Sequence, residues 1–184
     1  MSLFSRLRAV WSSCFDKPAL ERSVEQAIKR QHPRRILEIG LGDGRRARGV
    51  LALAQRYHAR HEVHFIGIDL FEDRHAGEAP FPLKEAYRNL RSTGARVRLV
   101  PGDAHGALVR AANTLTGLDL VLVSAQVSKL SLAPAWFYLP RTLAKNAIVL
   151  WADGTLPDGE YRPVSRTELL AAARPLRTAR RRAA

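Results

Sequence analysis

Short apolar segments alternate with amphipathic ones along most of this 184-residue chain. The apolar segments are rich in Val, Ile and Leu and occupy residues 35–39, 63–68, 97–100, 119–123 and 147–151. Such runs are typical of parallel strands that are buried on both faces. Helical patterns occupy residues 18–31, 44–58, 83–92, 104–114 and 134–145. This alternation predicts an α/β fold, a Rossmann-like, doubly wound, mostly parallel sheet of about five or more strands with helices on both faces.

Two parts of the chain depart from this alternation, the stretch 134–145 and the residues after 151. Pro134 and Pro140 both fall in the stretch 134–145. A proline in a helix interior removes a hydrogen bond, so we expect a broken helix that restarts near Pro140. After residue 151 the sequence predicts one further strand and one short helix.

Composition limits the class of protein. The length suits one domain with a single core. No apolar run reaches the roughly 20 residues that cross a bilayer, and Arg6 and Arg8 interrupt the apolar N-terminus, so we expect neither a transmembrane segment nor a secretory signal. Cys14 is the only cysteine. One cysteine forms no internal disulfide, which fits a reducing, cytoplasmic location.

The formal net charge is +13, and most of the basic residues are arginines. A charge of this size can direct a protein to nucleic acid through its arginine-rich surface. An exposed, solvated surface rich in arginine explains the same composition. The C-terminal tail carries Arg174, Arg177, Arg180, Arg181 and Arg182.

Three glycines follow the first predicted strand. Gly40, Gly42 and Gly44 sit where that strand turns into a helix. Glycines there permit positive φ and close approach of a ligand to the backbone, and the helix start offers free N–H groups. A dinucleotide-binding loop would place its third glycine at position 45, but Arg45 is there.

The observed pattern, Glu38-x-Gly40-x-Gly42-x-Gly44, resembles the first motif of the class I S-adenosylmethionine-dependent methyltransferases. The resemblance continues in the right order through Asp69, Asp103 and Asp119 and covers residues 35–151. It implies S-adenosylmethionine as cofactor and says nothing about the acceptor. The cofactor-binding residues it implies are Glu38, Gly40, Gly42, Gly44, Asp69, Leu70, Asp103, Ala104 and Ser124.

The resemblance also implies a role for each acidic residue. Asp69 would accept hydrogen bonds from both ribose hydroxyls, since a carboxylate has two oxygens to share. Asp103 would lie beside the adenine, although its position also suits an N-cap. Glu38 would bind the methionine amino group or fix the loop through backbone hydrogen bonds, while Asp119 is better explained as structural. Because this cofactor has no phosphate, we expect Arg45, Arg46 and Arg48 to form the exposed face of the following helix.

The acceptor side lacks recognised motifs. The fourth predicted strand ends in Ser124-Ala125-Gln126-Val127, without the prolyl turn of amino-methylating nucleic-acid enzymes. Cys14 lies in the N-terminal arm, which excludes cytosine-carbon methylation. Ser124 stands where the metal-dependent branch has a metal-ligating Asp, so we predict no catalytic metal. The histidines at 58, 61 and 64 do not suggest a metal site either, because the last of them enters a strand.

Other acceptor-side features carry alternatives. Asp153 is a weak candidate for a catalytic base, and an Asp-Gly turn explains it as well. Residues 136–138, Trp-Phe-Tyr, would wall an apolar acceptor pocket or pack in the core. Residues 71–86 are long enough to form a lid over cofactor or acceptor.

We divide the chain into an N-terminal arm (1–17), a cofactor-binding Rossmann-like domain (18–156) and a C-terminal extension with the basic tail (157–184). The arm has an apolar stripe that suits docking on the domain or lying on a membrane surface. The prediction is a metal-independent S-adenosylmethionine-dependent methyltransferase with an unidentified acceptor. The alternative is a catalytically inactive, methyltransferase-like cofactor-binding or scaffold protein, with or without nucleic acid as a partner.

Overall fold

The structure is a computed structural model that describes residues 21–74, 81–127, 136–152 and 160–172. Its elements in chain order are α2 (Arg22–Gln31), β1 (Arg35–Ile39), α3 (Arg45–Ala54), η1 (Arg60–Glu62), β2 (His64–Asp69), η2 (Phe71–Asp73), α4 (Leu83–Arg91), β3 (Arg96–Pro101), α5 (Ala104–Ala111), β4 (Leu118–Val123), α7 (Leu139–Thr142), β5 (Leu143–Ala152) and β6 (Tyr161–Pro163). Residues 166–172 are also helical.

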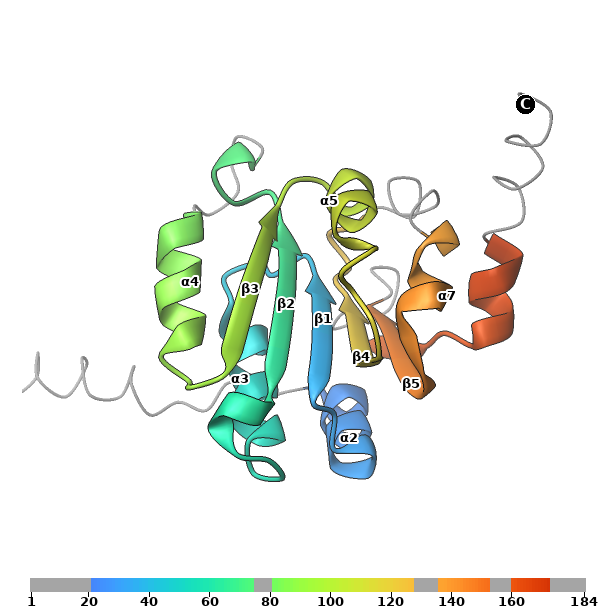
Figure 1. The fold of residues 1–184 in the computed structure, drawn as a ribbon, viewed down its shortest axis with the longest axis horizontal. Coiled ribbons are helices and arrows are strands. Elements are labelled where there is room, and N and C mark those ends of the chain that lie inside the picture. Colours follow the sequence, from blue (N-terminus) through green and yellow to red (C-terminus); the bar gives the residue numbers. More distant parts are fainter. Residues whose placement is uncertain (1–20, 75–80, 128–135, 153–159, 173–184) are drawn as a thin grey trace, which may run out of the picture.

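All six strands form one sheet in the order β3-β2-β1-β4-β5-β6 (Figure 1). Each neighbouring pair from β3 to β5 is parallel, and β6 pairs antiparallel with β5. Parallel neighbours require crossover connections, which is why a helical segment follows each of the first strands. The predicted doubly wound, mostly parallel α/β fold is confirmed.

Helices cover both faces of the sheet, as the continuous burial of β1 and β4 requires. One core cluster joins α2, α3 and α4 to the sheet and includes Ile28, Leu51 and Leu90. The other lies on the opposite face, against α5 and α7, and includes Leu108 and Leu139. In Figure 1, α5 and α7 stand in front of the sheet and α3 stands behind it.

The predicted segments differ from the observed ones mainly near α7. The expected break is confirmed, because Pro140 lies in the first turn of α7. The expectation of helix through residue 145 is wrong, since β5 already begins at Leu143, which pairs with Leu118 of β4. The pairing shifts between Leu118 and Leu120, so this first part of β5 continues the sheet irregularly. The strand and helix expected after residue 151 are present as β6 and residues 166–172.

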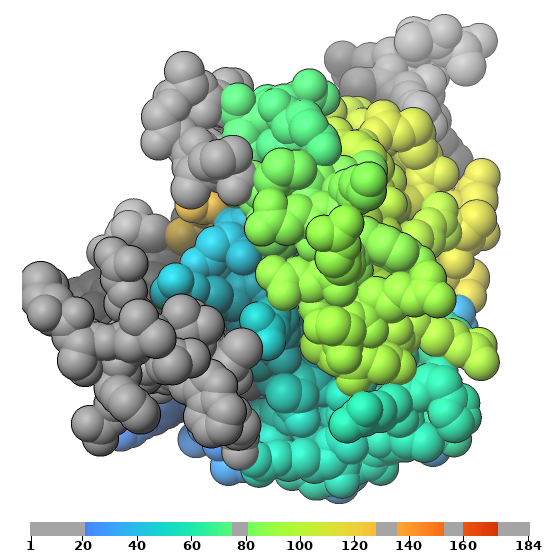
Figure 2. Space-filling model, turned by 90° about the vertical axis from the view of Figure 1, so that its left-hand side faces the viewer, coloured from blue at the N-terminus to red at the C-terminus, as the bar shows by residue number. Residues whose placement is uncertain are grey.

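The sheet has two edges, β3 and β6. Figure 2 looks at the β3 side of the molecule, where the green residues of α4 cover the middle of the surface. In strand β3 the residues alternate between exposed and more buried positions, unlike the fully covered central strands. Of the helices in the described residues, none combines the length and hydropathy that a bilayer span needs.

Candidate functional site

The glycine loop, residues 40–44, joins β1 to α3 at the carboxyl end of the sheet. Gly40, Gly42 and Gly44 have φ of 81°, 59° and 78°, all in the left-handed region that favours glycine. Gly44 is the N-cap of α3, so the free N–H groups of the helix start face the loop. The sequence prediction of a glycine-dependent turn at a helix start is therefore confirmed.

The two ends of the loop are closely packed, while its middle is open. A Cβ on Gly40 would lie 2.8 Å from Cβ of Ser124 and 2.9 Å from Cγ2 of Val127. A Cβ on Gly44 would lie 2.6 Å from Cζ of Phe81. A Cβ on Gly42 would meet only Oε1 of Gln126, at 3.9 Å, among the described residues. A group placed at this Cβ position would therefore touch no closely packed neighbour in that part of the chain.

Gly40→Ala is expected to lower the free energy of unfolding by about 2–4 kcal/mol, because the variant adds overpacking to a strained φ. Gly42→Ala is the matched control, because its φ is also positive but its Cβ would have no close neighbour among the described residues. This variant should lose about 1–2 kcal/mol of the free energy of unfolding. Urea denaturation of both variants measures the difference. Equal losses would contradict the close packing of Gly40 against the end of β4.

Glu38 is fully buried in β1 and binds Arg46 of the first turn of α3. Its Oε1 accepts a hydrogen bond from Nε at 2.9 Å and forms an ion pair with Nη2 at 2.8 Å. The same Nη2 donates to the carbonyl oxygen of Gly40 at 2.7 Å. Arg46 thus braces the start of the glycine loop. The expectation that Arg46 belongs to an exposed helix face is wrong, whereas Arg45 and Arg48 are exposed as predicted.

The other oxygen of Glu38 has no hydrogen-bond partner among the described residues. The hydroxyl of Tyr161, on β6, is also buried without one. Burial raises the pKa of Glu38, while the charge of Arg46 acts to lower it. Burial also raises the pKa of the Tyr161 hydroxyl well above its usual value, so this group stays protonated. Arg46 lies over the Tyr161 ring, 5.3 Å from its centroid.

Asp69 ends β2 and is buried beside the glycine loop. Oδ2 accepts a hydrogen bond from the backbone N–H of Leu41 at 2.7 Å, and Oδ1 accepts one from that of Phe71 at 3.2 Å. Arg74 donates to Oδ1 as well, through Nε and Nη2, both at 3.0 Å. Both carboxylate oxygens that were predicted to receive ribose hydroxyls are therefore engaged by the protein itself.

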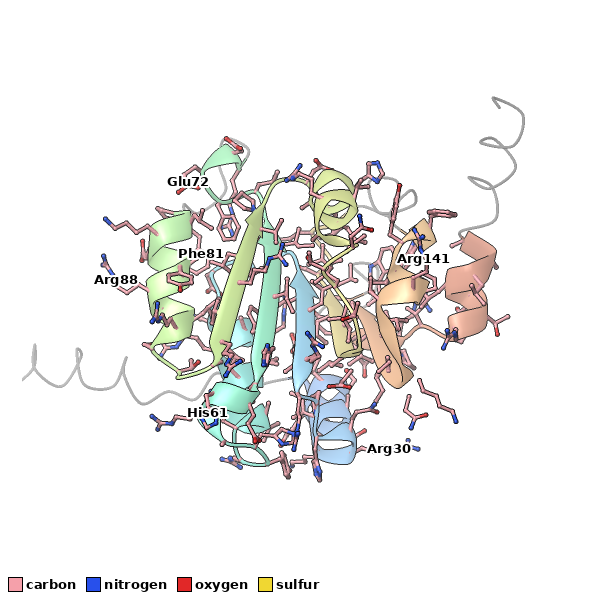
Figure 3. The ribbon with its side chains drawn as sticks, viewed as in Figure 1. Arg30, His61, Glu72, Phe81, Arg88 and Arg141 are labelled. Carbon is pink, nitrogen blue, oxygen red and sulfur yellow. The ribbon has the colours of Figure 1, made fainter. Side chains whose placement is uncertain are left out.

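Arg74 and Phe81 come from the segment that was predicted to form a lid. Nη2 of Arg74 donates to the carbonyl oxygen of Gly42 at 2.5 Å, and its guanidinium carbon lies 5.6 Å from the centroid of the Phe81 ring. Phe81 packs on Gly44, close to the upper end of α4 in Figure 3. Residues 75–80 between them lie outside the described residues. In this structure, two side chains of the β2–α4 connection thus cover the loop and Asp69.

The remaining acidic residues have structural partners. Asp103 is the N-cap of α5, and its Oδ1 accepts hydrogen bonds from the N–H groups of His105 and Gly106. Ala104 beside it is buried. Oδ2 of Asp119 accepts from the N–H groups of Arg34 and Arg35, which ties β4 to the start of β1. The capping role of Asp103 and the structural role of Asp119 are observed, and contact of Asp103 with a cofactor stays a prediction.

Two further predicted residues lie at the same edge of the sheet. Ser124 follows β4 and is buried against Gly40, with its N–H donating to the carbonyl oxygen of Ile39 at 2.9 Å. Leu70 follows Asp69 and precedes η2. The fold therefore gathers the loop, Asp69, Leu70 and Ser124 at one place, as the sequence predicted. Asp153, the candidate base, lies outside the described residues, as do the N-terminal arm and the basic tail.

The histidines and aromatic residues singled out by the sequence have other partners in the structure. The three histidines occupy a turn after α3, η1 and β2. Within the described ranges, no three His, Cys, Asp or Glu side chains group as metal ligands. Trp136 packs on Trp151 of β5 with ring centroids 5.2 Å apart. The two tryptophans line a cavity of about 200 Å³ on the face that carries α5 and α7.

Solved structures with this architecture carry methyltransferase descriptions. A TehB-like SAM-dependent methyltransferase from Corynebacterium glutamicum aligns with a TM-score of 0.50 at 16% identity, over 94% of this chain and 80% of that one. The calicheamicin methyltransferase CalS11 aligns with a TM-score of 0.58 at 18% identity, over 84% of this chain and 68% of that one. This chain shares the fold of these two proteins, a mostly parallel α/β sheet with helices on both faces. No protein-family model matches the sequence, and neither does any curated protein.

Sequence reasoning missed the residues that hold this fold together around the loop. Arg46 was placed on the surface, Arg74 and Phe81 were covered only by the general prediction of a lid, and Tyr161 was given no role. Arg46 carried a usable signal, because an arginine in the first turn of a helix opposes the helix dipole and so suggests a local carboxylate partner. Arg74, Phe81 and Tyr161 come from irregular or short segments, where no periodicity indicates which side chains turn inward.

Proposed function

We propose that this chain binds S-adenosylmethionine at the glycine loop and transfers its methyl group to an acceptor that the sequence does not identify. The observation that carries the proposal is the positive φ of Gly40, Gly42 and Gly44 at the carboxyl end of β1, next to a buried carboxylate at the end of β2. Ligands of doubly wound folds bind at this edge. The alignments support the same reaction class, since they join this fold to proteins described as methyltransferases.

The loop fits an adenosine-bearing cofactor in two respects. On the side of Gly42 where a Cβ would lie, the described residues leave room for a ligand against the backbone. Oε2 of Glu38 is a buried acceptor with no partner in the described residues, which suits an ammonium group that reaches it directly or through water. When bound, the cofactor supplies a methyl group on a sulfonium, and the protein holds an acceptor in line with it.

One feature of the site opposes binding. Arg74 occupies Oδ1 of Asp69, which the ribose hydroxyls would need. Binding through Asp69 therefore requires Arg74 to leave, while the N–H groups of Leu41 and Phe71 keep the carboxylate oriented. We infer that Arg74 competes with the ribose and lowers the affinity of the unmodified protein.

Calorimetric titration with S-adenosylmethionine and S-adenosylhomocysteine tests the proposal. We expect binding below millimolar Kd for at least one of them, and about tenfold tighter binding to Arg74→Ala, because a charge-assisted hydrogen bond no longer has to be broken. Arg88→Ala is the matched control, since Arg88 is exposed on the outer side of α4 (Figure 3) and its loss should leave the affinity unchanged.

The same titration separates the second candidate function, a methyltransferase-like scaffold. The engagement of Asp69 by Arg74 favours this candidate, because it fills the ribose position with a side chain of the protein. Absence of binding by both the unmodified protein and Arg74→Ala would contradict the methyltransferase proposal and support the scaffold. Tight binding without turnover of labelled S-adenosylmethionine in cell extract would support a cofactor-binding protein that lacks transferase activity.

A further inference from the structure

A row of basic side chains crosses the amino-terminal ends of three strands, whereas the glycine loop lies at the carboxyl-terminal ends. In the parallel register Arg35 of β1 pairs with His64 of β2, and His64 pairs with Arg96 of β3. Residues in register on adjacent strands point to the same face of a sheet. Arg98 lies two residues further along β3 and therefore points to that face as well. Like charges placed side by side in a sheet are destabilising, so this row requires an explanation.

These side chains line a cavity of about 200 Å³. Its floor includes Phe65 and Ile66, and its far wall is formed by Thr114, Thr116 and Leu118, from the connection between α5 and β4. Helix α5 ends at Ala111 and stands over the carboxyl-terminal halves of the strands, so it does not cover the amino-terminal halves of β1 to β3 (Figure 1). The fold leaves a recess there, and the basic row borders it.

The arginines of the row contact neutral groups at the rim of the recess and form no ion pairs with described residues. Nη1 of Arg98 donates to Oγ1 of Thr114 at 2.6 Å, and this hydroxyl in turn donates to the carbonyl oxygen of Ala111. Nη1 of Arg35 lies 3.8 Å from the position that a Cβ on Gly117 would take. Among the described residues, none of Arg35, Arg96 and Arg98 forms an ion pair.

One carboxylate lies close to the row and offsets part of its charge, but it is not among the residues that line the recess. Asp119 lies next to Leu118 of the cavity wall, but its Oδ2 binds the backbone N–H groups of Arg34 and Arg35. None of the residues that line the recess is acidic. Burial, together with the charges of Arg96 and Arg35, lowers the pKa of His64. The basic side chains of the row thus disfavour a protonated His64.

We propose that this recess binds a phosphate group. The guanidinium groups of Arg35, Arg96 and Arg98 would hold it on one side, and the threonines of the α5–β4 connection, Thr114 and Thr116, would lie on the other. Guanidinium groups bind phosphate oxygens in pairs of parallel hydrogen bonds, and three of them at one rim surround such a group without a competing carboxylate. The group belongs to a small phosphorylated molecule or to a nucleic-acid backbone. The site is separate from the glycine loop, so it does not depend on the proposed methyltransferase activity.

The first experiment uses the unmodified protein. The pKa of His64 is measured by NMR with and without inorganic phosphate at constant ionic strength, with sodium chloride as the comparison. A phosphate bound among the arginines stabilises the imidazolium, so we expect the His64 pKa to rise. His61, which is exposed on η1 (Figure 3), serves as the internal control. An unchanged pKa of His64 at saturating phosphate would overturn the proposal.

The second experiment compares two double variants with equal changes of charge. Arg96→Gln/Arg98→Gln removes half of the basic row, and Arg30→Gln/Arg88→Gln removes two exposed arginines that point away from the domain (Figure 3). We expect the first pair to weaken phosphate or oligonucleotide binding about tenfold or more, and the second to leave it within about twofold. Equal effects would show that only net charge matters and would overturn the site.

The two sources of phosphate are separated by the probes. Binding of inorganic phosphate and pyrophosphate without binding of a single-stranded oligonucleotide supports a small phosphorylated ligand. If the oligonucleotide binds, the slope of log K against log salt should fall by about 0.7 for each backbone phosphate that Arg96→Gln/Arg98→Gln no longer neutralises. Failure of all three probes to bind would overturn the proposal. Circular dichroism of each variant confirms that the fold is retained.

Discussion

Arg46→Met is expected to lower the free energy of unfolding by about 3–5 kcal/mol, because it leaves the carboxylate of Glu38 buried without its counter-charge. Glu38 is fully buried, and Nε and Nη2 of Arg46 both bind its Oε1. The hydrogen bond to the carbonyl oxygen of Gly40 is lost as well. Urea denaturation at neutral pH measures the effect.

Two comparisons test the origin of this loss. Arg45→Met, at an exposed neighbour, should change the stability by no more than about 0.5 kcal/mol. Glu38→Gln/Arg46→Met should recover part of the loss, because a neutral amide costs less to bury than a carboxylate. If the double variant loses as much free energy of unfolding as Arg46→Met alone, the charge of Glu38 does not cause the destabilisation.

The pH dependence of Arg46→Met has a definite sign. Burial already raises the pKa of Glu38 in the folded protein, and removal of Arg46 takes away the charge that acts to lower it. A carboxyl whose folded pKa exceeds its unfolded value stabilises the fold at low pH, and this stability is lost as pH rises through the folded pKa. The deficit of Arg46→Met should therefore be smaller at acidic pH than at pH 8.

Asp69→Asn is expected to destabilise the protein by about 3–5 kcal/mol, since it leaves the nearly buried guanidinium of Arg74 without its carboxylate. The variant also replaces an acceptor with an amide that competes with the N–H groups of Leu41 and Phe71. Thermal and urea unfolding measure the loss. Arg74→Ala keeps the contacts of Asp69 with Leu41 and Phe71, which Asp69→Asn disturbs, so Arg74→Ala is the better variant for testing cofactor binding.

The control for Asp69→Asn is Asp43→Asn in the same loop. Asp43 is exposed and pairs with the exposed Arg45. The free energy of unfolding of Asp43→Asn should therefore stay within about 0.5 kcal/mol of that of the unmodified protein. Arg74→Gln combined with Asp69→Asn replaces the ion pair with a neutral pair and should be more stable than Asp69→Asn alone. If the double variant is no better, the destabilisation comes from the backbone contacts of Asp69 and not from Arg74.

The sequence predicted the sheet well because its signal is distributed over many residues. The run that ends at Ile39 is apolar from Ile36 except for Glu38, and the run that ends at Val123 is apolar from Leu120; short runs of this kind are typical of strands buried on both faces. The prediction was wrong at Leu143, where the local sequence permits a helix but pairing with Leu118 extends β5. Pairing between residues 25 positions apart in sequence is not encoded in a local periodicity.

The candidate site was predicted in position but not in its contacts. The order Glu38, Gly40, Asp69 and Ser124 places these residues at the ends of three adjacent strands, which follows from topology alone. The partner of Asp69 could not be predicted in this way. Arg74 is one of many arginines in the chain, and its approach to Asp69 depends on the turn that η2 makes.

The position of Arg96 and Arg98 on β3 has a consequence for self-association. β3 is an edge strand, and an edge presents unpaired N–H and C=O groups to any second strand that approaches it. A second copy of this chain that added its own β3 edge-on would bring two sets of arginines together, and their repulsion opposes such pairing. The two side chains that we assign to phosphate binding thus also oppose edge-to-edge association of the sheets of two copies of this chain.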